Sequence, residues 1–300
     1  MSILELSHVS KSFGSRKIIE DISFSVQEGT IFGFIGQNGA GKTTTMKMIL
    51  GLLPIDSGQI FVHGEKVSYG QNKTNQYIGY LPDVPEFYGF MTSKEYLILC
   101  GEIVGLPKAD LSKRVNELLE MVGLSKANKR IQGFSRGMKQ RLGIAQALLH
   151  SPKLLICDEP TSALDPVGRK EILDILAEVK KETTVVFSTH ILSDVERICD
   201  TIAFLHDGTI ALQGSLDEIK GTHKGAGAEL DFCNLEDRKK FHQLYMGGVF
   251  VNPLRLQYKQ IKEKDMMQMM KVLVEQEIPI QKIEMLEPNL EDLFLEVVKK

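Results

Sequence analysis

The sequence predicts an α/β fold with a mostly parallel core sheet, an antiparallel β subdomain and a helical subdomain, followed by a small C-terminal α+β domain. Three observations support this prediction. Apolar segments typical of strands alternate with helical periodicity between residues 154 and 205, which implies right-handed crossovers and parallel strands. A glycine-rich loop follows an apolar strand at residues 31–43. A polar, glycine-rich stretch at residues 220–227 precedes a second pattern of strands and helices.

The antiparallel strands are expected on both sides of the first helix. Residues 3–9 and 17–26 alternate apolar and polar side chains, and residues 59–67 repeat this pattern around His63-Gly64-Glu65. Such alternation is typical of strands with one buried face.

A phosphate-binding pattern, G-x-x-x-x-G-K-[ST], lies between the apolar run 31–35 and the helix-forming residues 44–50. Glycines let the backbone N–H groups point at phosphate oxygens, and the following helix adds its positive end. We expect Lys42 to reach the β and γ phosphates and the Thr43 hydroxyl to hold Mg²⁺. The alternative is a glycine-rich turn that binds nothing, but every fixed position is matched, so the pattern predicts a P-loop NTPase. The residues expected at the phosphates are Gly36, Gln37, Asn38, Gly39, Ala40, Gly41, Lys42, Thr43 and Thr44.

Residues 92 to about 150 are expected to be mostly helical. Thr92-Ser93-Lys94-Glu95 is a capping box, and Val115, Leu118, Leu119 and Val122 follow helical spacing. Ser135 is placed as the N-cap of a later helix, where its hydroxyl and the nearby N–H groups form an anion site. The alternative is an ordinary helix cap with a basic first turn.

Acidic and histidine side chains follow two further strands. Residues 154–157 lead into Asp158 and Glu159, and residues 183–189 lead into His190. We expect Asp158 to orient Mg²⁺ through its water shell and Glu159 to polarise an attacking water. His190 is expected to bond the γ-phosphate and sense its loss. Each feature alone is common on ordinary surfaces, but their combination with the phosphate loop favours a catalytic site.

The rest of the chain completes both domains. Asp165 and Pro166 predict the start of a helix whose buried stripe contains Ile172, Ile175, Leu176 and Val179, and Asp207-Gly208 predicts a hairpin. After residue 227 we expect the order strand, helix, strand, strand, helix, strand, helix. Core packing is favoured over a metal site or an adaptable binding groove for residues at helical spacing, namely Met266, Met269, Met270 and Leu273.

Composition narrows the class of protein. The chain has 300 residues and a net charge of −3, which argues against electrostatic binding of nucleic acid, and no nucleic-acid partner is expected. No uncharged apolar run approaches the roughly 20 residues that cross a bilayer, and the first residues lack a basic and then apolar leader. We therefore expect a cytosolic chain. Reduced, partly buried thiols are expected at the four isolated cysteines, Cys100, Cys157, Cys199 and Cys233.

Taken together, residues 1 to about 220 resemble an ATP-binding cassette (ABC) ATPase, with a helical subdomain at about 90–150. The resemblance implies that Phe13 stacks on adenine. It also implies that Ser135 and Gly137 form the signature that contacts ATP, that residues 162–165 signal across a dimer, and that His190 is the switch histidine. Residues 225–300, with the ending Pro288 to Phe294, resemble the accessory domain of export ATPases.

The sequence departs from the family pattern in two motifs. The signature, normally Leu-Ser-Gly-Gly-Gln, has Phe134, Arg136 and Met138 in place of Leu, the first Gly and Gln. Asp83 occupies the position of a Gln that contacts Mg²⁺ and the water. Its carboxylate is a candidate Mg²⁺ ligand, although its charge would repel a γ-phosphate if the ion were absent.

The resemblance implies an ATP-hydrolysing subunit at the cytoplasmic face of the cell membrane, held there by a multispanning permease. Two protomers, expected to be identical, would sandwich ATP between Lys42 of one and Ser135 and Gly137 of the other, and this dimerisation would power export. The transported substrate is determined by the permease. The alternatives are a soluble ABC ATPase acting in translation or DNA repair and a scaffold that binds nucleotide only. A single phosphate loop, no sustained heptads and the complete set of motifs favour the transporter subunit.

Overall fold

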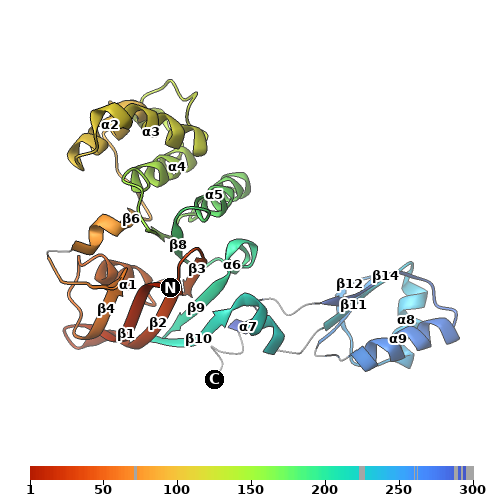
Figure 1. Ribbon diagram of the computed structural model, residues 1–300. Helices are drawn as coiled ribbons and strands as arrows, with labels where there is room; N and C mark the ends of the chain where they lie inside the picture. The colour runs from red at the N-terminus through yellow and green to blue at the C-terminus, as the bar shows by residue number, and fades with distance from the viewer. Residues whose placement is uncertain are drawn as a thin grey trace. The chain divides into compact units, whose positions relative to one another are not determined.

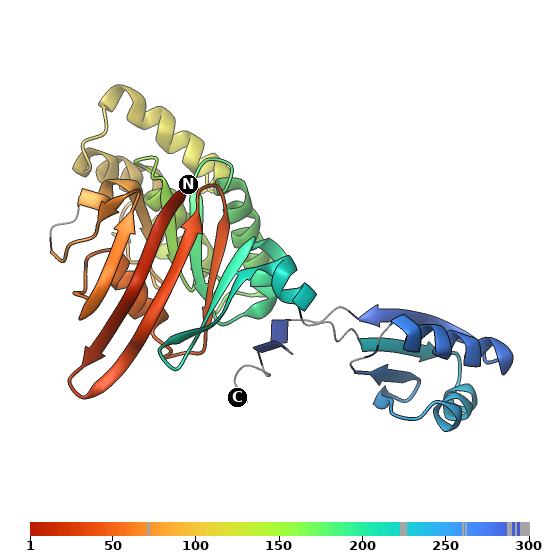
Figure 2. The same cartoon turned by 60° about the horizontal axis from the view of Figure 1, so that its bottom comes forward.

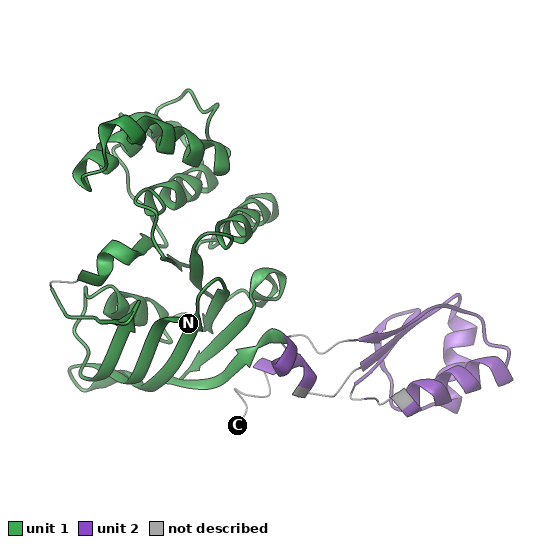
Figure 3. Cartoon of the chain, viewed as in Figure 1, with its two compact units in different colours: residues 1–216 green, residues 217–300 purple. Residues whose placement is uncertain are grey.

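The computed structural model describes residues 1–70, 73–222, 227–259, 261, 263–286, 290–291 and 293–294. The chain divides into two compact units, Met1–Leu216 and Asp217–Lys300 (Figure 3).

The first unit contains one sheet with the strand order β5-β4-β1-β2-β10-β9-β3-β8-β7-β6 (Figure 1). The strands are β1 Ser2–Phe13, β2 Arg16–Gln27, β3 Ile31–Gly36, β4 Ser57–Val62, β5 Glu65–Lys66, β6 Ile78–Leu81, β7 Leu154–Asp158, β8 Thr184–Thr189, β9 Thr201–His206 and β10 Thr209–Ser215. One region of this sheet is antiparallel, and the other is parallel except for the antiparallel β9–β10 hairpin. The short pairing Thr209↔Asp21 joins the two regions. The predicted fold class is therefore confirmed.

The parallel region places the candidate residues. Strand β3 pairs in parallel with β8 and β9, and β7 pairs in parallel with β8 and β6. All side chains of β3, β7 and β8 are buried. Because the carboxyl ends of parallel strands meet at one edge, the segments that follow these three strands come together there.

Strand β6 was not predicted from the sequence. It has only four residues, and Gly79 interrupts its apolar run. The structure explains this glycine, since a Cβ at position 79 would lie 2.2 Å from the carbonyl oxygen of Ala147. Close packing against the helical subdomain therefore selects a residue that weakens the strand pattern.

The antiparallel region consists of long, half-buried strands. β1 pairs with both β2 and β4, and all three lie side by side in Figures 1 and 2. Apolar side chains from these strands and from the first helix, α1 Lys42–Ile49, form one core with β3. Within it the ring of Phe24 stacks on that of Phe32, with centroids 5.2 Å apart. This core supports the strand that precedes the phosphate loop.

The helical subdomain gathers at one end of the first unit (Figure 1). It contains α2 Ser93–Ile103, α3 Lys108–Met121, the short 3₁₀ turn Ile131–Gly133 and α4 Arg136–Ala147. The predicted capping box is confirmed, because the Thr92 hydroxyl accepts a bond from Glu95 N–H and the Glu95 carboxylate accepts one from Thr92 N–H. A Cβ at Gly143 would lie 2.4 Å from Leu81 Cδ1, so α4 packs closely on β6.

Further helices lie between strands of this unit in the sequence. They are η1 Lys73–Tyr77, α5 Pro166–Val179 and α6 Leu192–Ile198, and α7 Leu216–Thr222 begins at the boundary with the second unit. Asp165 caps α5 as predicted, since its carboxylate accepts a bond from Gly168 N–H at 3.0 Å. The hairpin at Asp207-Gly208 is also confirmed, joining β9 and β10.

The second unit has a four-stranded antiparallel sheet in the order β12-β13-β11-β14. Its elements are β11 Gly227–Phe232, α8 Leu235–Leu244, β12 Val249–Asn252, β13 Arg255–Tyr258, α9 Glu263–Glu275 and β14 Ile280–Leu286. This order of strands and helices was predicted, and it is the split β-α-β, ferredoxin-like arrangement. The last predicted helix, near Pro288 to Phe294, lies mostly outside the described residues.

Two expectations about buried side chains were partly wrong. Met266, Met269 and Leu273 are buried in the core of the second unit, but Met270 is 45% exposed, because the buried stripe of α9 is narrower than the sequence spacing indicated. The four cysteines are free, but Cys233 is exposed rather than partly buried. Among the described residues, no helix has the length and apolar character needed to span a membrane.

Candidate functional site

The phosphate loop connects β3 to α1 and is open to solvent at its tip. Gln37, Asn38 and Gly39 are exposed, and so is Thr43 in the first turn of α1. Gly41 caps the helix with a φ of 110°, and a Cβ there would lie 2.5 Å from Ile19 Cδ1. Only glycine fits this backbone and this space, so the pattern glycine has a local structural reason.

Lys42 is held inside the curl of this loop. Its Nζ donates to the carbonyl oxygens of Gly36 at 2.7 Å and Gln37 at 3.1 Å, and its side chain is only 5% exposed. The Thr45 hydroxyl donates to the Gly41 carbonyl oxygen at 3.0 Å and supports the first turn of α1. The cation is therefore positioned beneath the loop whose N–H groups would face phosphate.

Glu159 lies between Lys42 and His190. Its Oε1 is 3.0 Å from Lys42 Nζ, and its Oε2 is 2.9 Å from His190 Nδ1. Oε1 is buried and has no aligned hydrogen bond, so its contact with Lys42 is electrostatic. Glu159 also has a φ of 49°, a left-handed conformation that is strained for a glutamate. Three residues far apart in the sequence are thus in direct contact.

Asp158 is almost fully buried beside this group. Ser188 Oγ donates to Asp158 Oδ1 at 2.6 Å and accepts a bond from Glu159 N–H at 3.1 Å. Ser188 therefore fixes both acidic residues at once. Ser188 was not predicted as a site residue. It could have been found from its place two residues before His190, and in the sheet it pairs in register with Asp158.

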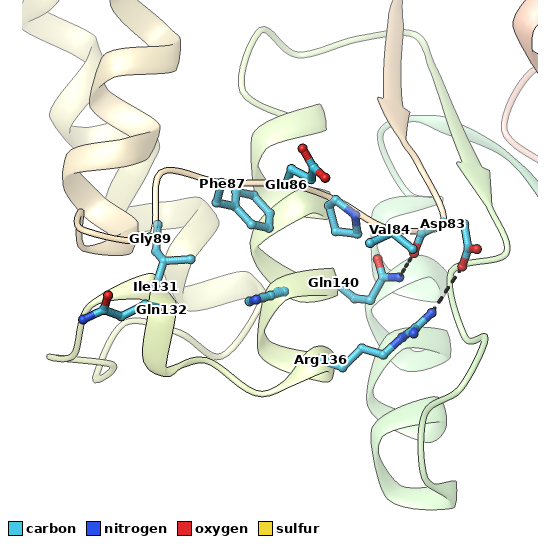
Figure 4. A pocket seen from close by; sticks show the side chains of 11 residues that line it. Asp83, Val84, Glu86, Phe87, Gly89, Ile131, Gln132, Arg136 and Gln140 are labelled. Carbon is cyan, nitrogen blue, oxygen red and sulfur yellow. Dashed lines mark hydrogen bonds and ion pairs between the residues drawn. The ribbon is translucent and has the colours of Figure 1, made fainter.

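Asp83 follows β6 and contacts the first turns of α4 (Figure 4). Arg136 Nη2 donates to Asp83 Oδ1 at 3.3 Å, and Gln140 Nε2 donates to the Asp83 carbonyl oxygen at 2.7 Å. Burial raises the pKa of Asp83, Arg136 opposes this, and the charges of Asp158 and Glu159 raise it further. Asp83 is thus within electrostatic range of the acidic pair, and the two departures from the family pattern contact each other.

Ser135, Gly137 and Phe13 lie apart from this group. The Ser135 hydroxyl accepts a bond from Met138 N–H at 3.2 Å, so the predicted N-cap is present at the start of α4. In the described part of the chain, no hydrogen bond or ion pair joins Ser135 or Gly137 to Lys42. Phe13 ends β1 with half of its side chain exposed, and Lys11 Nζ lies 5.5 Å from its ring centroid.

The residues fit a magnesium ion that is bound together with phosphate. Within the described ranges, no group of three or more histidine, cysteine, aspartate or glutamate side chains is arranged to hold a metal by itself. Mg²⁺ is usually bound by one or two carboxylates together with substrate phosphates. The exposed Thr43 and the fixed carboxylate of Asp158 supply oxygen ligands of this kind.

Comparisons with known proteins show the family of this chain. A family model described as ABC transporter matches residues 19–162. An uncharacterized ABC transporter ATP-binding protein of Bacillus subtilis (strain 168), YxlF, is 47% identical over 73% of this chain and 72% of its own length. The bacitracin transport ATP-binding protein BcrA of Bacillus licheniformis is 36% identical over 99% of this chain and 97% of its own length.

A solved structure agrees as well. The ATP-binding subunit of an ABC transporter is 35% identical, with a TM-score of 0.65, and the match covers 73% of this chain and 92% of that chain. This structure shares the fold of the matched part of the chain. The chain therefore belongs to the ATP-binding subunits of ABC transporters, and it is an ATPase.

Proposed function

We propose that the chain powers export of a substrate through a separate multispanning membrane permease, by ATP-driven dimerisation at the cytoplasmic face of the membrane. The match to BcrA supports a role in transport because it covers almost the whole of both chains, including the second unit. That relative is named a bacitracin transport ATP-binding protein. The chemical identity of the substrate transported here depends on the permease.

The contact of Glu159 with both Lys42 and His190 carries the proposed chemistry. ATP bound at the loop would place its γ-phosphate near Lys42, and Glu159 would accept the proton of the attacking water. His190 would hold Glu159 and bond the γ-phosphate through its second ring nitrogen. Phosphoryl transfer requires little covalent chemistry from the protein, so the positions and charges of the side chains around the γ-phosphate determine the rate.

Mg²⁺ would be held by Thr43 and, through water, by Asp158, and it would neutralise phosphate charge. Asp83 is a third candidate for this group because it is within electrostatic range of Asp158. Phe13, exposed at the end of β1, would stack on adenine. The loop residues Gly36 to Thr44 would bind the phosphates through backbone N–H groups.

The second half of the site would come from a second, identical protomer. Ser135 is the N-cap of α4, and its hydroxyl accepts a bond from Met138 N–H. Both Ser135 and the next residue, Arg136, are exposed, so the N-terminus of α4 is open to solvent. The N-terminus of a helix attracts anions, so the tips of two chains can each cover the ATP of the other. ATP then joins the two protomers, and hydrolysis releases them, which makes the dimer a two-state element that ligand controls.

Calorimetry with the full chain tests the nucleotide site. Lys42→Ala should weaken Mg²⁺-ATP binding at least about thirtyfold, since losing a charged hydrogen bond costs about 2 kcal/mol or more. Lys47→Ala is the matched control, because Lys47 is exposed on the same helix. Equal affinity in the two variants would contradict the proposed role of Lys42.

Co-purification from detergent-solubilised membranes tests the partner. We expect the chain to be recovered with a multispanning protein, and the Glu159→Gln variant to accumulate as a dimer with bound ATP. Recovery with ribosomes or DNA, and not with a membrane protein, would favour instead a role in translation or DNA repair.

A further inference from the structure

A buried carboxylate outside the nucleotide site links three segments of the first unit. Asp194, in α6, is only 3% exposed. Its Oδ2 accepts a bond from the Thr161 hydroxyl at 2.7 Å, and its Oδ1 accepts one from Arg169 Nη2 at 2.6 Å. Thr161 is itself fully buried. Both carboxylate oxygens are therefore used, as expected for a buried charge with a structural task.

Two of the three segments joined by Asp194 carry catalytic candidates. Thr161 lies two residues after Glu159, and Asp194 lies four residues after His190. Arg169 belongs to α5, which begins directly after the loop 162–165. The bond between Thr161 and Asp194 thus joins the same two stretches of chain as the bond between Glu159 and His190.

The turn that contains Thr161 needs such a restraint. Glu159 and Ala163 have φ values of 49° and 53°, which are strained for residues other than glycine. Within the turn, Ser162 N–H donates to the Glu159 carbonyl oxygen at 3.0 Å. Strained backbone persists only where surrounding contacts fix it. The buried bond to Asp194 is such a contact from outside the turn.

We propose that Asp194, acting through Thr161, is a positioning residue that sets the distance between Glu159 and His190. Arg169 completes the arrangement by neutralising the buried carboxylate and tying it to α5. This inference rests on the proposed role of Glu159 in hydrolysis. Among the described residues, no hydrogen bond or ion pair joins Asp194 or Thr161 to the nucleotide loop, so their loss should alter turnover and leave nucleotide binding unchanged.

The test compares Thr161→Val with Thr161→Ser in the full chain. The valine variant keeps the shape but removes the hydroxyl, so we expect kcat for ATP to fall at least tenfold while KM stays within about twofold. The serine variant keeps the hydroxyl and should restore most of the turnover. Asp194→Asn, which removes the charge that faces Arg169, should resemble the valine variant.

Asp174→Asn is the matched control for loss of a charge between the same helices. Asp174 in α5 pairs with Arg197 in α6 at 2.8 Å, but both side chains are exposed. This variant should keep wild-type kcat. Thermal melting of all variants separates loss of fold from loss of turnover. Should Thr161→Val fail to fold, Arg169→Gln replaces it, with kcat expected to fall at least threefold at constant KM.

Two outcomes separate the inference from the function on which it rests. If Glu159→Gln turns over ATP at the wild-type rate, the proposed role of Glu159 is wrong, and the inference is overturned with it. If Glu159→Gln is inactive while folded Thr161→Val matches the wild type, the inference alone is overturned. A rise in KM as large as the fall in kcat would also contradict a positioning role.

Discussion

The ion pair between Lys42 and Glu159 should compete with nucleotide for the lysine. The Nζ atom that would reach the phosphates lies 3.0 Å from Glu159 Oε1, and the two side chains are 5% and 12% exposed. To bind Lys42, a phosphate must therefore displace the carboxylate of Glu159, which is negatively charged like the phosphate. Replacing Glu159 by glutamine removes this competitor and a negative charge near the γ-phosphate, so it should tighten nucleotide binding.

The size of the effect follows from the distance and the burial. With an effective dielectric constant of about 20, Coulomb's law gives roughly 5 kcal/mol of attraction between unit charges 3.0 Å apart. The solvation lost by both groups cancels most of this, and we expect a net contribution of about 1–2 kcal/mol. Glu159→Gln should therefore bind ADP about tenfold more tightly than the wild type.

Calorimetry with ADP in the absence of magnesium measures this effect without hydrolysis or a metal ion. Glu178→Gln is the control, because it makes the same change in net charge at an exposed residue that pairs only with Lys181 in the described structure. The control should bind ADP like the wild type. Equal or weaker binding by Glu159→Gln would refute the competition between Glu159 and the phosphates for Lys42.

Three other predictions follow from single contacts. Phe13→Ala should weaken ATP binding about tenfold, since base stacking is worth about 1–3 kcal/mol, and calorimetry should show this without a change in melting temperature because the ring is half exposed. Gly41→Ala should lower the free energy of unfolding by about 1–3 kcal/mol in urea, and by more than Gly39→Ala, whose added Cβ would meet open space. Asp83→Asn and Arg136→Gln should each change the free energy of unfolding by less than about 1 kcal/mol. Their effects on ATP turnover should not add in the double variant, and additive effects would show that the pair has no functional coupling.

The fold of the first unit could be predicted because local signals agree with the tertiary structure. The phosphate loop, the capping box at Thr92 and the cap at Asp165 each satisfy backbone groups at a helix end, so short stretches of sequence report them. Long-range packing gives no such local signal. Strand β6 contains Gly79 because a helix lies against it, and Met270 faces solvent because of how α9 meets its sheet. Both misses depend on a neighbouring element rather than on the segment itself.

The same distinction applies to the site. The sequence predicted Lys42, Glu159 and His190 as site residues from their places after strands, and the parallel sheet explains why these places converge. The partners that hold them were missed, because Ser188 and Asp194 belong to no short pattern and are recognised only through their buried hydrogen bonds.

Asp83 and Arg136, which both depart from the family pattern, have to be considered together. Taken separately, an aspartate at position 83 adds a negative charge near the phosphates, and an arginine at position 136 adds a bulky cation to the signature. In the structure these two side chains form one ion pair between the loop after β6 and the first turn of α4. Their charges cancel, and the arginine is held beside the aspartate rather than left free at the helix tip. The departures are therefore better understood as one paired change, in which the signature helix gains a contact with the segment that approaches Asp158 and Glu159.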